Sequence, residues 1–274
     1  MDLAPVRNGF RRLSTLRRLA GHADVLIMLV LPLLVLAVWW LASALSTISP
    51  IFLPSPTTVW KTAIQIFTHG YRSTSIWQNI AYSFSHLLYA FGIITVIGVP
   101  LGWMMGRSHF WRRLFDPLVE FLRPLPPLAY LSLLIIWFGV GHTTQIILLT
   151  IAGFPVLVTA ARSAASAVPE ERLKTAAAFG ATGVQVFWYV IFPSGLPELI
   201  TGMRLLSGML FGTVVAAEMI SSRQGLGWMI LDASDFLRSD VIFVGIFIMA
   251  GLGFSMDRGF RLLERLVVPW KGKG

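Results

Sequence analysis

Two features of the sequence predict an all-α, polytopic membrane protein with six membrane-spanning helices: a very apolar composition and a series of long apolar segments. Of the 274 residues, 55% are hydrophobic and 13% are charged, whereas soluble domains carry about 25% charged residues. The mean hydropathy is +0.73. A soluble domain of this size would need a more charged surface, so an integral membrane protein is the starting class. The absence of cysteine excludes disulfides, thiolate metal sites and cysteine nucleophiles.

Each apolar segment is expected to cross the bilayer as a helix, which takes roughly 20 mainly apolar residues. The first segment ends near Trp39 and Trp40, an aromatic pair typical of a membrane interface. The residues after Pro56 are expected to form a short amphipathic helix along the membrane surface. We predict a single transmembrane domain over residues 25–274, preceded by a basic arm over residues 1–24. The six predicted spans are residues 25–45, 80–105, 125–138, 143–161, 196–220 and 241–258.

The basic residues are distributed unevenly between the loops. The N-terminal arm, the loops after the second and fourth spans, and the C-terminal tail hold 17 of the 22 Lys and Arg residues, and the other loops hold 4. The positive-inside rule then places both termini in the cytoplasm. This placement explains the net charge of +9 without nucleic acid as a partner. A basic arm that binds anionic lipid is an additional possibility.

The segment between the fourth and fifth spans carries most of the functional information. Pro169, Glu170 and Glu171 suit the first turn of a helix. Small residues follow, glycines at 180 and 183 break the pattern, and a second short helix is expected before Pro193. Prolines and glycines at 193, 195 and 197 predict a turn into the fifth span. A small, apolar surface in a water-exposed loop suits the docking of another protein, and it fits an amphipathic helix resting on lipid equally well.

This segment resembles the EAA loop of binding-protein-dependent ABC transporter permeases. That motif reads Glu-Ala-Ala, three residues, Gly, nine residues, Ile-x-Leu-Pro, and alignment on Gly180 matches Ala176 and the run that ends in Pro193. Lys174 replaces the motif glutamate and Thr175 the first alanine. The resemblance implies that the loop over residues 162–195 forms a coupling helix seated in a groove of an ATPase subunit. It assigns the following residues to ATPase coupling: Glu170, Glu171, Lys174, Thr175, Ala176, Ala177, Phe179, Gly180, Ala181 and Pro193.

Further strings resemble the taurine and alkanesulfonate branch of that family. They are ISPIFLPSP at 48–56, RPLPPLAYLSLLIIWFGVG at 123–141, FPSGLPELITGMR at 192–204 and VVAAEMISSRQGLGWMILDA at 214–233. The resemblance implies a type I importer permease in the bacterial inner membrane. It also implies a second copy of the chain, two ATPase subunits that bind ATP and Mg²⁺, and a periplasmic binding protein that delivers a small sulfonate, with taurine as the first expectation. Another alkanesulfonate, nitrate or a vitamin precursor is the alternative substrate.

Motifs of an active enzyme are absent from the sequence. There is no G-x-x-x-x-G-K string followed by Ser or Thr, which would cradle phosphates, and no HExxH or G-x-S-x-G string. We therefore expect a non-catalytic subunit without a cofactor or metal of its own, which takes its energy from a partner. A secondary anion transporter is a more distant alternative, and it would predict inverted repeats, which the sequence does not display.

Polar residues in the fifth span are costly in a bilayer and need a reason. Arg204 either snorkels or pairs structurally, or it faces an anionic substrate along the path. Glu218 is expected to have a structural or gating role as a hydrogen-bond acceptor. Ser207 and Thr213 bind either substrate or the backbone of their own helix. These four residues, Arg204, Ser207, Thr213 and Glu218, are the candidates for the translocation path.

Three smaller expectations complete the sequence-based predictions. The small residues of the fifth span, Gly202, Ser207, Gly208 and Gly212, should permit close helix approach. Residues 221–227 should form a mobile outside loop that could meet the binding protein. The five histidines are scattered, none has metal-ligand spacing, and His142 should be solvated in an outside turn.

Overall fold

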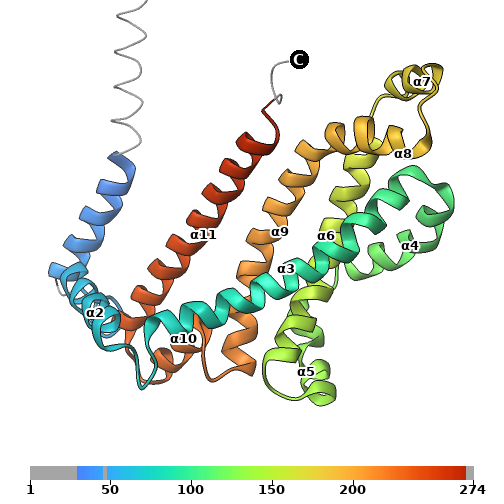
Figure 1. Ribbon diagram of the computed structural model, residues 1–274. Helices are drawn as coiled ribbons and strands as arrows, with labels where there is room; N and C mark the ends of the chain where they lie inside the picture. Colours follow the sequence, from blue (N-terminus) through green and yellow to red (C-terminus); the bar gives the residue numbers. More distant parts are fainter. Residues whose placement is uncertain (1–29, 46–47, 270–274) are drawn as a thin grey trace, which may run out of the picture. The chain divides into compact units, whose positions relative to one another are not determined.

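The computed structural model describes residues 30–45 and 48–269, and all regular elements in these ranges are helices (Figure 1). The predicted basic arm over residues 1–24 lies outside the described residues. The described residues divide into two compact units, with the boundary between residues 62 and 63. The first unit contains the apolar helix Val30–Ala44 and the start of α2 (Pro56–His69). The helix expected after Pro56 is therefore confirmed.

The second unit contains the long apolar helices. Four helices are long and apolar enough to cross a membrane: α3 (Ile76–Arg107), α6 (His142–Ser166), the continuous helix Gly183–Ser221 and α11 (Ser239–Val267). A fifth crossing results if the pair α4 (His109–Leu122) and α5 (Pro127–Phe138) forms one span, although the two helices meet at 95°.

The predicted count of six spans is thus matched only in part. The third predicted span is the 12-residue α5, and the described part of the first span is the shorter helix Val30–Ala44. Prolines at 124, 126 and 127 explain the sharp bend before α5, because proline cannot continue a helix across that point.

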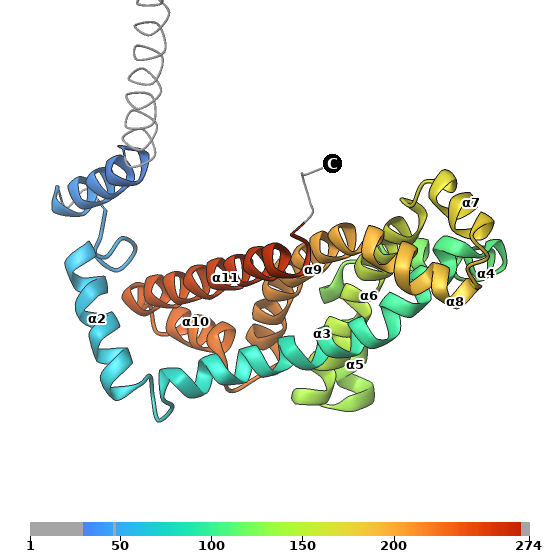
Figure 2. The same ribbon diagram turned by 45° about the horizontal axis from the view of Figure 1, so that its top comes forward.

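The helices α3, α6 and α9 (Phe192–Ser221) lie side by side and enclose the main core (Figures 1 and 2). Close approach of α3 to α6 depends on Gly102 and Gly106, one turn apart on the contact face. A Cβ atom at Gly102 would lie 2.6 Å from the Cβ of Ala161, and one at Gly106 would lie 2.6 Å from the Cβ of Ala165. Small residues at four-residue spacing let membrane helices approach closely.

The close helix approach expected from the fifth span is confirmed at Gly202, whereas Gly208 and Gly212 contact no other helix among the described residues. A Cβ atom at Gly202 would collide with Ala160 of α6. Among the described residues, nothing lies within 4 Å of a Cβ atom built at Gly208 or Gly212. Their face of α9 is open within one copy of the chain, because the contacts of α9 with α6 run along a different stripe of the helix.

Short helices close the two ends of this bundle (Figure 1). At one end of the bundle α3 and α6 end, and the chain continues from α6 through α7 (Glu170–Ala178) and α8 (Gly183–Val186) into α9. The α9 helix ends at the opposite end, where α10 (Leu226–Asp235) leads into α11. The segment singled out by the sequence therefore lies at the opposite end of the bundle from the buried Glu218 and Ser221 of α9.

Candidate functional site

The linking segment, residues 167–191, joins α6 to α9 and begins with the short helix α7. The end of α7 is closed by two backbone hydrogen bonds: the N–H of Ala181 donates to the carbonyl of Ala176 at 3.1 Å, and the N–H of Gly180 donates to that of Ala177 at 2.9 Å. Gly180 has φ +75°, a conformation that glycine adopts without a Cβ penalty. This is a Schellman cap, and it fixes the direction in which the chain leaves α7.

The next helix begins at once with its own cap. Thr182 accepts from the N–H of Gln185 at 3.4 Å, and the side chain of Gln185 accepts from the N–H of Thr182 at 2.8 Å. This reciprocal pair is a capping box, which satisfies two N–H groups that have no partner inside the helix. The sequence therefore encodes helix, glycine turn and helix locally, as the pattern around Gly180 predicts.

The predicted turn at Pro193 is wrong. A π-helix, η1 (Phe187–Ile191), connects α8 directly to α9, and the N–H of Phe192 donates to the carbonyl of Phe187. Pro193 occupies the first turn of α9, where proline is tolerated. Because proline has no N–H, the shift to longer-range π bonding just before it keeps the helix continuous. Residues 183–221 thus form one helix of 39 residues.

The outer surface of the linking segment is exposed and contains apolar side chains. No residue of α7 or α8 is buried. Phe179 is 87% exposed and Tyr189 is 79% exposed, and Val184 between them is exposed as well. Exposed apolar side chains grouped on one short segment are typical of a surface that contacts another protein or a membrane.

The residues of α7 predicted for coupling lie together on this surface. Lys174, which replaces the motif glutamate, lies 3.3 Å from Glu170 in an exposed pair one turn apart. Such a pair contributes about 0.3–0.5 kcal/mol, so it does little to fix α7. Thr175 donates its hydroxyl to the carbonyl of Glu171 at 2.8 Å. Most of the α7 surface is therefore free for a partner.

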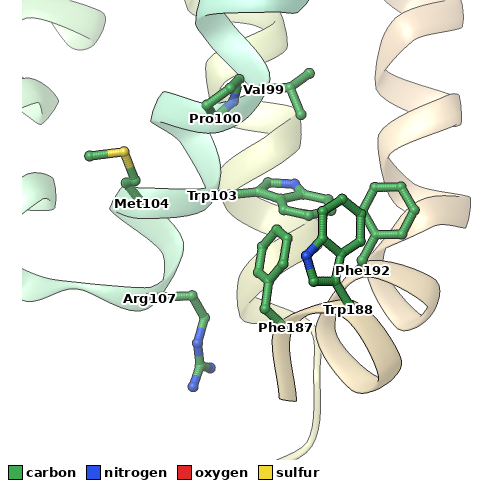
Figure 3. Close-up of a pocket in the computed structure, with 8 residues that line it drawn as sticks. All are labelled: Val99, Pro100, Trp103, Met104, Arg107, Phe187, Trp188 and Phe192. Atoms are coloured by element: carbon green, nitrogen blue, oxygen red, sulfur yellow. The ribbon is translucent and has the colours of Figure 1, made fainter. Parts of the chain in front are cut away.

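The inner side of the linking segment is held tightly against the bundle. Trp103 of α3 forms edge-to-face contacts with Phe187 and Phe192, with ring centroids 5.0 and 5.1 Å apart (Figure 3). Gly195 of α9 approaches α6 so closely that a Cβ atom there would lie 2.7 Å from the carbonyl oxygen of Ala164. The end of the linking segment and the start of α9 are therefore packed against α3 and α6.

Arg204 forms an ion pair with Asp257 of α11. Asp257 also accepts from Arg261 at 2.8 Å, so two arginines share one carboxylate and the trio carries one net positive charge. A small cavity of about 70 Å³ adjoins this pair, lined also by Ser207 and the open Gly208. Arg204 thus has a structural partner in Asp257 and also borders a cavity, and its contact with an anionic substrate stays a prediction.

The hydroxyls proposed for the path are bonded within α9. Ser207 donates to the carbonyl of Arg204 at 2.7 Å, and Thr213 donates to the carbonyl of Met209 at 3.0 Å. Hydroxyls in membrane helices often satisfy themselves in this way. Each oxygen remains able to accept a further hydrogen bond.

Glu218 is fully buried at the opposite end of α9. Its carboxylate accepts from the hydroxyl of Ser83 on α3 and from the N–H of Gly227 on α10, each at 2.9 Å. Asn79, one turn before Ser83, accepts from the N–H of Gly225 at 3.0 Å. The polar groups of three helices therefore meet around Glu218 and hold α3, α9 and α10 together.

Sequence reasoning missed Asn79 and Ser83. Their four-residue spacing places them on one face of α3, and this spacing of polar residues in an apolar helix was the available indication. Gln145 of α6 was also missed, and it donates to the carbonyl and hydroxyl of Ser221 at 3.2 Å. The partners lie 76 or more positions away in the chain, so the sequence alone did not pair them.

The predicted mobile loop at residues 221–227 is wrong. Ser221, Gly225 and Leu226 are buried, and the N–H of Leu226 donates to Ser83 at 3.0 Å. Gly225 has φ +105°, and a Cβ atom there would lie 2.5 Å from the carboxyl carbon of Glu218. Within this stretch only Arg223 and Gln224 are exposed, because the N–H groups of the three residues that follow donate to buried side chains of α3 and α9.

Two of the histidines expected to be scattered are neighbours in space. His142 is exposed, and its ring stacks on buried His86 with the centroids 4.7 Å apart. The nitrogen atoms His142 Nδ1 and His86 Nε2 are 2.7 Å apart, and His86 Nδ1 donates to the carbonyl of Tyr82. In the part of the chain that the structure describes, no group of three His, Asp or Glu side chains could hold a metal ion.

Comparisons with known proteins agree with this architecture. Residues 98–269 match the family model described as "binding-protein-dependent transport system inner membrane component". The chain is 39% identical over 239 residues to the taurine transport system permease protein TauC of Escherichia coli, covering 87% of each protein. It is 34% identical over 241 residues to the putative aliphatic sulfonates transport permease protein SsuC of Escherichia coli, covering 88% of this chain and 90% of the relative.

A solved structure shares the fold. The inward-facing MetNI methionine ABC transporter matches with a TM-score of 0.61 at 19% identity, over 70% of this chain and 97% of the other. The family match covers more than half of the chain and the relatives cover most of it. The chain therefore belongs to the family of binding-protein-dependent transport system inner membrane components, the non-catalytic, multi-pass permease subunits of ABC transporters.

Proposed function

We propose that the chain is the permease of an ATP-driven importer and that the linking segment docks on an ATPase subunit. The exposed, apolar outer surface of the linking segment is the observation that carries this proposal. Phe179, Val184 and Tyr189 are exposed there, while the aromatic side chains of the same segment that point inward pack on α3. The segment therefore has one side for a partner and one side for the bundle.

Force passes from the ATPase to the path through a continuous helix. Residues 183–221 form one helix, so the docked α8 and the path-side stretch of α9 move together. ATP and Mg²⁺ are held by the partner, whose closure would displace the linking segment. Because Gly195 and Trp103 pack tightly against neighbouring helices, that displacement would reorient α9 relative to α6 and α3 and open the path alternately to each side.

A small sulfonate, with taurine first, is the substrate class that we propose. The relatives named for taurine and for aliphatic sulfonates support this class. The trio of Arg204, Asp257 and Arg261 has one net positive charge beside a small cavity, which suits the passage of an anion. Another alkanesulfonate, nitrate or a vitamin precursor is the alternative, because a periplasmic binding protein would make the main selection.

The assembly that we propose contains two copies of the chain, two ATPase subunits and a periplasmic binding protein. The open face of α9 at Gly208 and Gly212 would be covered by a second copy. Basic residues cluster at the end of the bundle where the linking segment lies, as in Arg107, Arg113 and Arg172. The positive-inside rule assigns that end, with both termini, to the cytoplasm of a bacterium.

Growth on taurine as the sole sulfur source tests the function. Cells that lack this subunit should fail to grow on taurine and should recover when the chain is restored together with its ATPase and binding protein. Uptake of labelled taurine should require ATP and should be reduced by excess alkanesulfonate but not by excess nitrate. Uptake by the purified chain alone in vesicles would instead identify a secondary anion transporter.

A further inference from the structure

An apolar cavity opens beside the π-helix, and neither the docking of the ATPase nor the path along α9 uses it. Its volume is about 510 Å³, within the range of about 300–1,000 Å³ typical of sites for small molecules and cofactors. The wall on one side is α3 and on the other side η1 and the start of α9 (Figure 3). The residues that line the cavity are Val99, Pro100, Trp103, Met104, Arg107, Phe187, Trp188 and Phe192.

The cavity is apolar along its length and cationic at one end. Val99 and Arg107 are eight residues apart on α3, which corresponds to about 12 Å along the helix axis. Figure 3 shows Val99 and Pro100 at one end, the aromatic rings in the middle, and the guanidinium group of Arg107 at the other end. Arg107 is exposed and forms no ion pair with any residue in the described ranges.

An apolar stretch that ends at a cationic group is complementary to the acyl chain and the phosphate of a phospholipid. Arg107 is the last residue of α3, so its charge lies where the membrane helix ends and the headgroup region begins. The apolar part of the cavity extends back along the helix toward the hydrocarbon core. An acyl chain would fill the aromatic part, while the phosphate would reach Arg107 and form a charge-assisted hydrogen bond. A small sulfonate has no apolar body to fill such a space.

We propose that this cavity binds one acyl chain of an anionic glycerophospholipid, with Arg107 holding the phosphate. The bound chain lies against Phe187 and Trp188 of the π-helix and against Phe192, the first residue of α9. It therefore supports the point where the linking segment continues into α9. The inference rests on the proposed function only in that the inner leaflet is taken to face this end of the bundle.

Lipid retention by the purified full-length permease tests the proposal, measured by native mass spectrometry after exchange into lipid-free detergent. The probes are phosphatidylglycerol and phosphatidylcholine with identical acyl chains. Wild-type protein should retain one phosphatidylglycerol per chain with a preference of roughly fivefold over phosphatidylcholine, the factor expected for one basic residue at an anionic surface. Arg107→Gln should abolish that preference, whereas Arg113→Gln, which changes an exposed arginine near the same end of the bundle that does not line the cavity, should keep it.

Filling the cavity separates acyl-chain binding from headgroup attraction. Val99→Trp should reduce retention of both lipids to background, and Val96→Trp should leave retention unchanged, because Val96 is 74% exposed and does not line the cavity. If Val99→Trp fails to give monodisperse protein, Met104→Trp fills the cavity from its exposed edge. Unchanged retention in the filled variants, or an unchanged lipid preference in Arg107→Gln, overturns the proposal.

A second copy of the chain is the other possible occupant. In that case wild-type protein would retain no stoichiometric lipid, and Val99→Trp would change the mass of the assembly instead, which also overturns the proposal. Lipid retention is measured on the permease without the ATPase. A loss of lipid binding can therefore be told apart from a loss of ATPase docking. Loss of ATPase binding with normal lipid retention would count only against the proposed function.

Discussion

Arg204 of α9 and Asp257 of α11 form an ion pair in which Asp257 is shared with Arg261. The pair joins two apolar helices and borders a small cavity that also contains the open Gly208. A carboxylate shared between two arginines leaves part of their charge uncompensated. The pair can therefore hold the helices together and still attract an anion.

Arg204→Ala is expected to reduce anion uptake about tenfold or more, the factor expected for loss of one hydrogen bond to a charged group. Assembly with the ATPase should change little, because α9 keeps its contacts with α6. Asp257→Asn should affect uptake less, since it keeps Arg204 in place. Initial uptake rates in vesicles, with co-purification of the ATPase, are the measurements.

Arg238→Ala is the matched control for Arg204→Ala. It removes an arginine from another arginine–aspartate pair, with Asp240, whose nitrogen and oxygen atoms are 2.8 Å apart. Uptake by this variant should equal that of the wild type. Equal losses in Arg204→Ala and Arg238→Ala, or no loss in Arg204→Ala, would remove Arg204 from the path.

Gly180→Pro is expected to abolish transport without preventing membrane insertion. Gly180 has φ +75°, whereas proline requires a φ near −65°, so the Schellman cap cannot form and α7 loses its direction. Transport and ATPase co-purification should both be lost, while the amount of permease in the membrane should stay near that of the wild type. Uptake assays and quantitative blotting of membranes check these outcomes.

Two further variants test whether the effect of Gly180→Pro comes from the conformation of the turn and from the exposed surface of α7. Gly183→Ala should be neutral, because nothing among the described residues lies within 4 Å of its added Cβ atom and its φ is not positive. Ala177→Glu leaves the turn intact but places a charge on the exposed surface of α7, and it should also abolish ATPase binding. Normal uptake in both Gly180→Pro and Ala177→Glu would contradict the docking role.

Glu218→Ala is expected to lower the stability of the permease by about 2–6 kcal/mol, since two buried donors lose their acceptor at about 1–3 kcal/mol each. The donors are the hydroxyl of Ser83 and the N–H of Gly227. Glu218→Gln keeps one acceptor oxygen and should cost less. The measurement is the apparent melting temperature in detergent, which should fall from the wild type to Glu218→Gln and further to Glu218→Ala. Equal melting temperatures would show that this cluster does not hold α3, α9 and α10 together.

Gly102→Val is expected to weaken the packing of α3 on α6 by about 1–3 kcal/mol, the usual cost of overpacking. A Cβ atom at Gly102 would already lie 2.6 Å from Ala161. Gly92→Val on the same helix is the control, because nothing among the described residues lies within 4 Å of a Cβ atom there. A lower apparent melting temperature only in Gly102→Val is the predicted result.

The parts predicted correctly from the sequence depend on local chemistry. The glycine turn at Gly180 follows from a Schellman cap and a capping box, each contained in about six residues. The family follows from several strings with fixed spacing. The apolar segments predicted the main helices because length and hydropathy determine whether a helix can cross a bilayer.

The parts that were predicted incorrectly depend on contacts outside the local sequence or on competing local rules. Pro193 was interpreted as a turn because proline interrupts helices, but the π-helix before it keeps the helix continuous. Residues 221–227 appeared polar and mobile, yet their N–H groups are needed by Glu218 and by Asn79. The partners Asn79 and Gly225 are 146 positions apart, so only the folded chain shows that they meet.

Cysteine crosslinking of the linking segment tests the central claim most directly, because the chain contains no native cysteine. Phe179→Cys places a thiol on the exposed end of α7, and Arg223→Cys places one on the exposed turn after α9. We predict that Phe179→Cys crosslinks to the ATPase subunit and resists an impermeant maleimide added outside intact cells, while Arg223→Cys is labelled and does not crosslink. Labelling of Phe179→Cys from outside, or no crosslink in an actively transporting complex, would contradict the account.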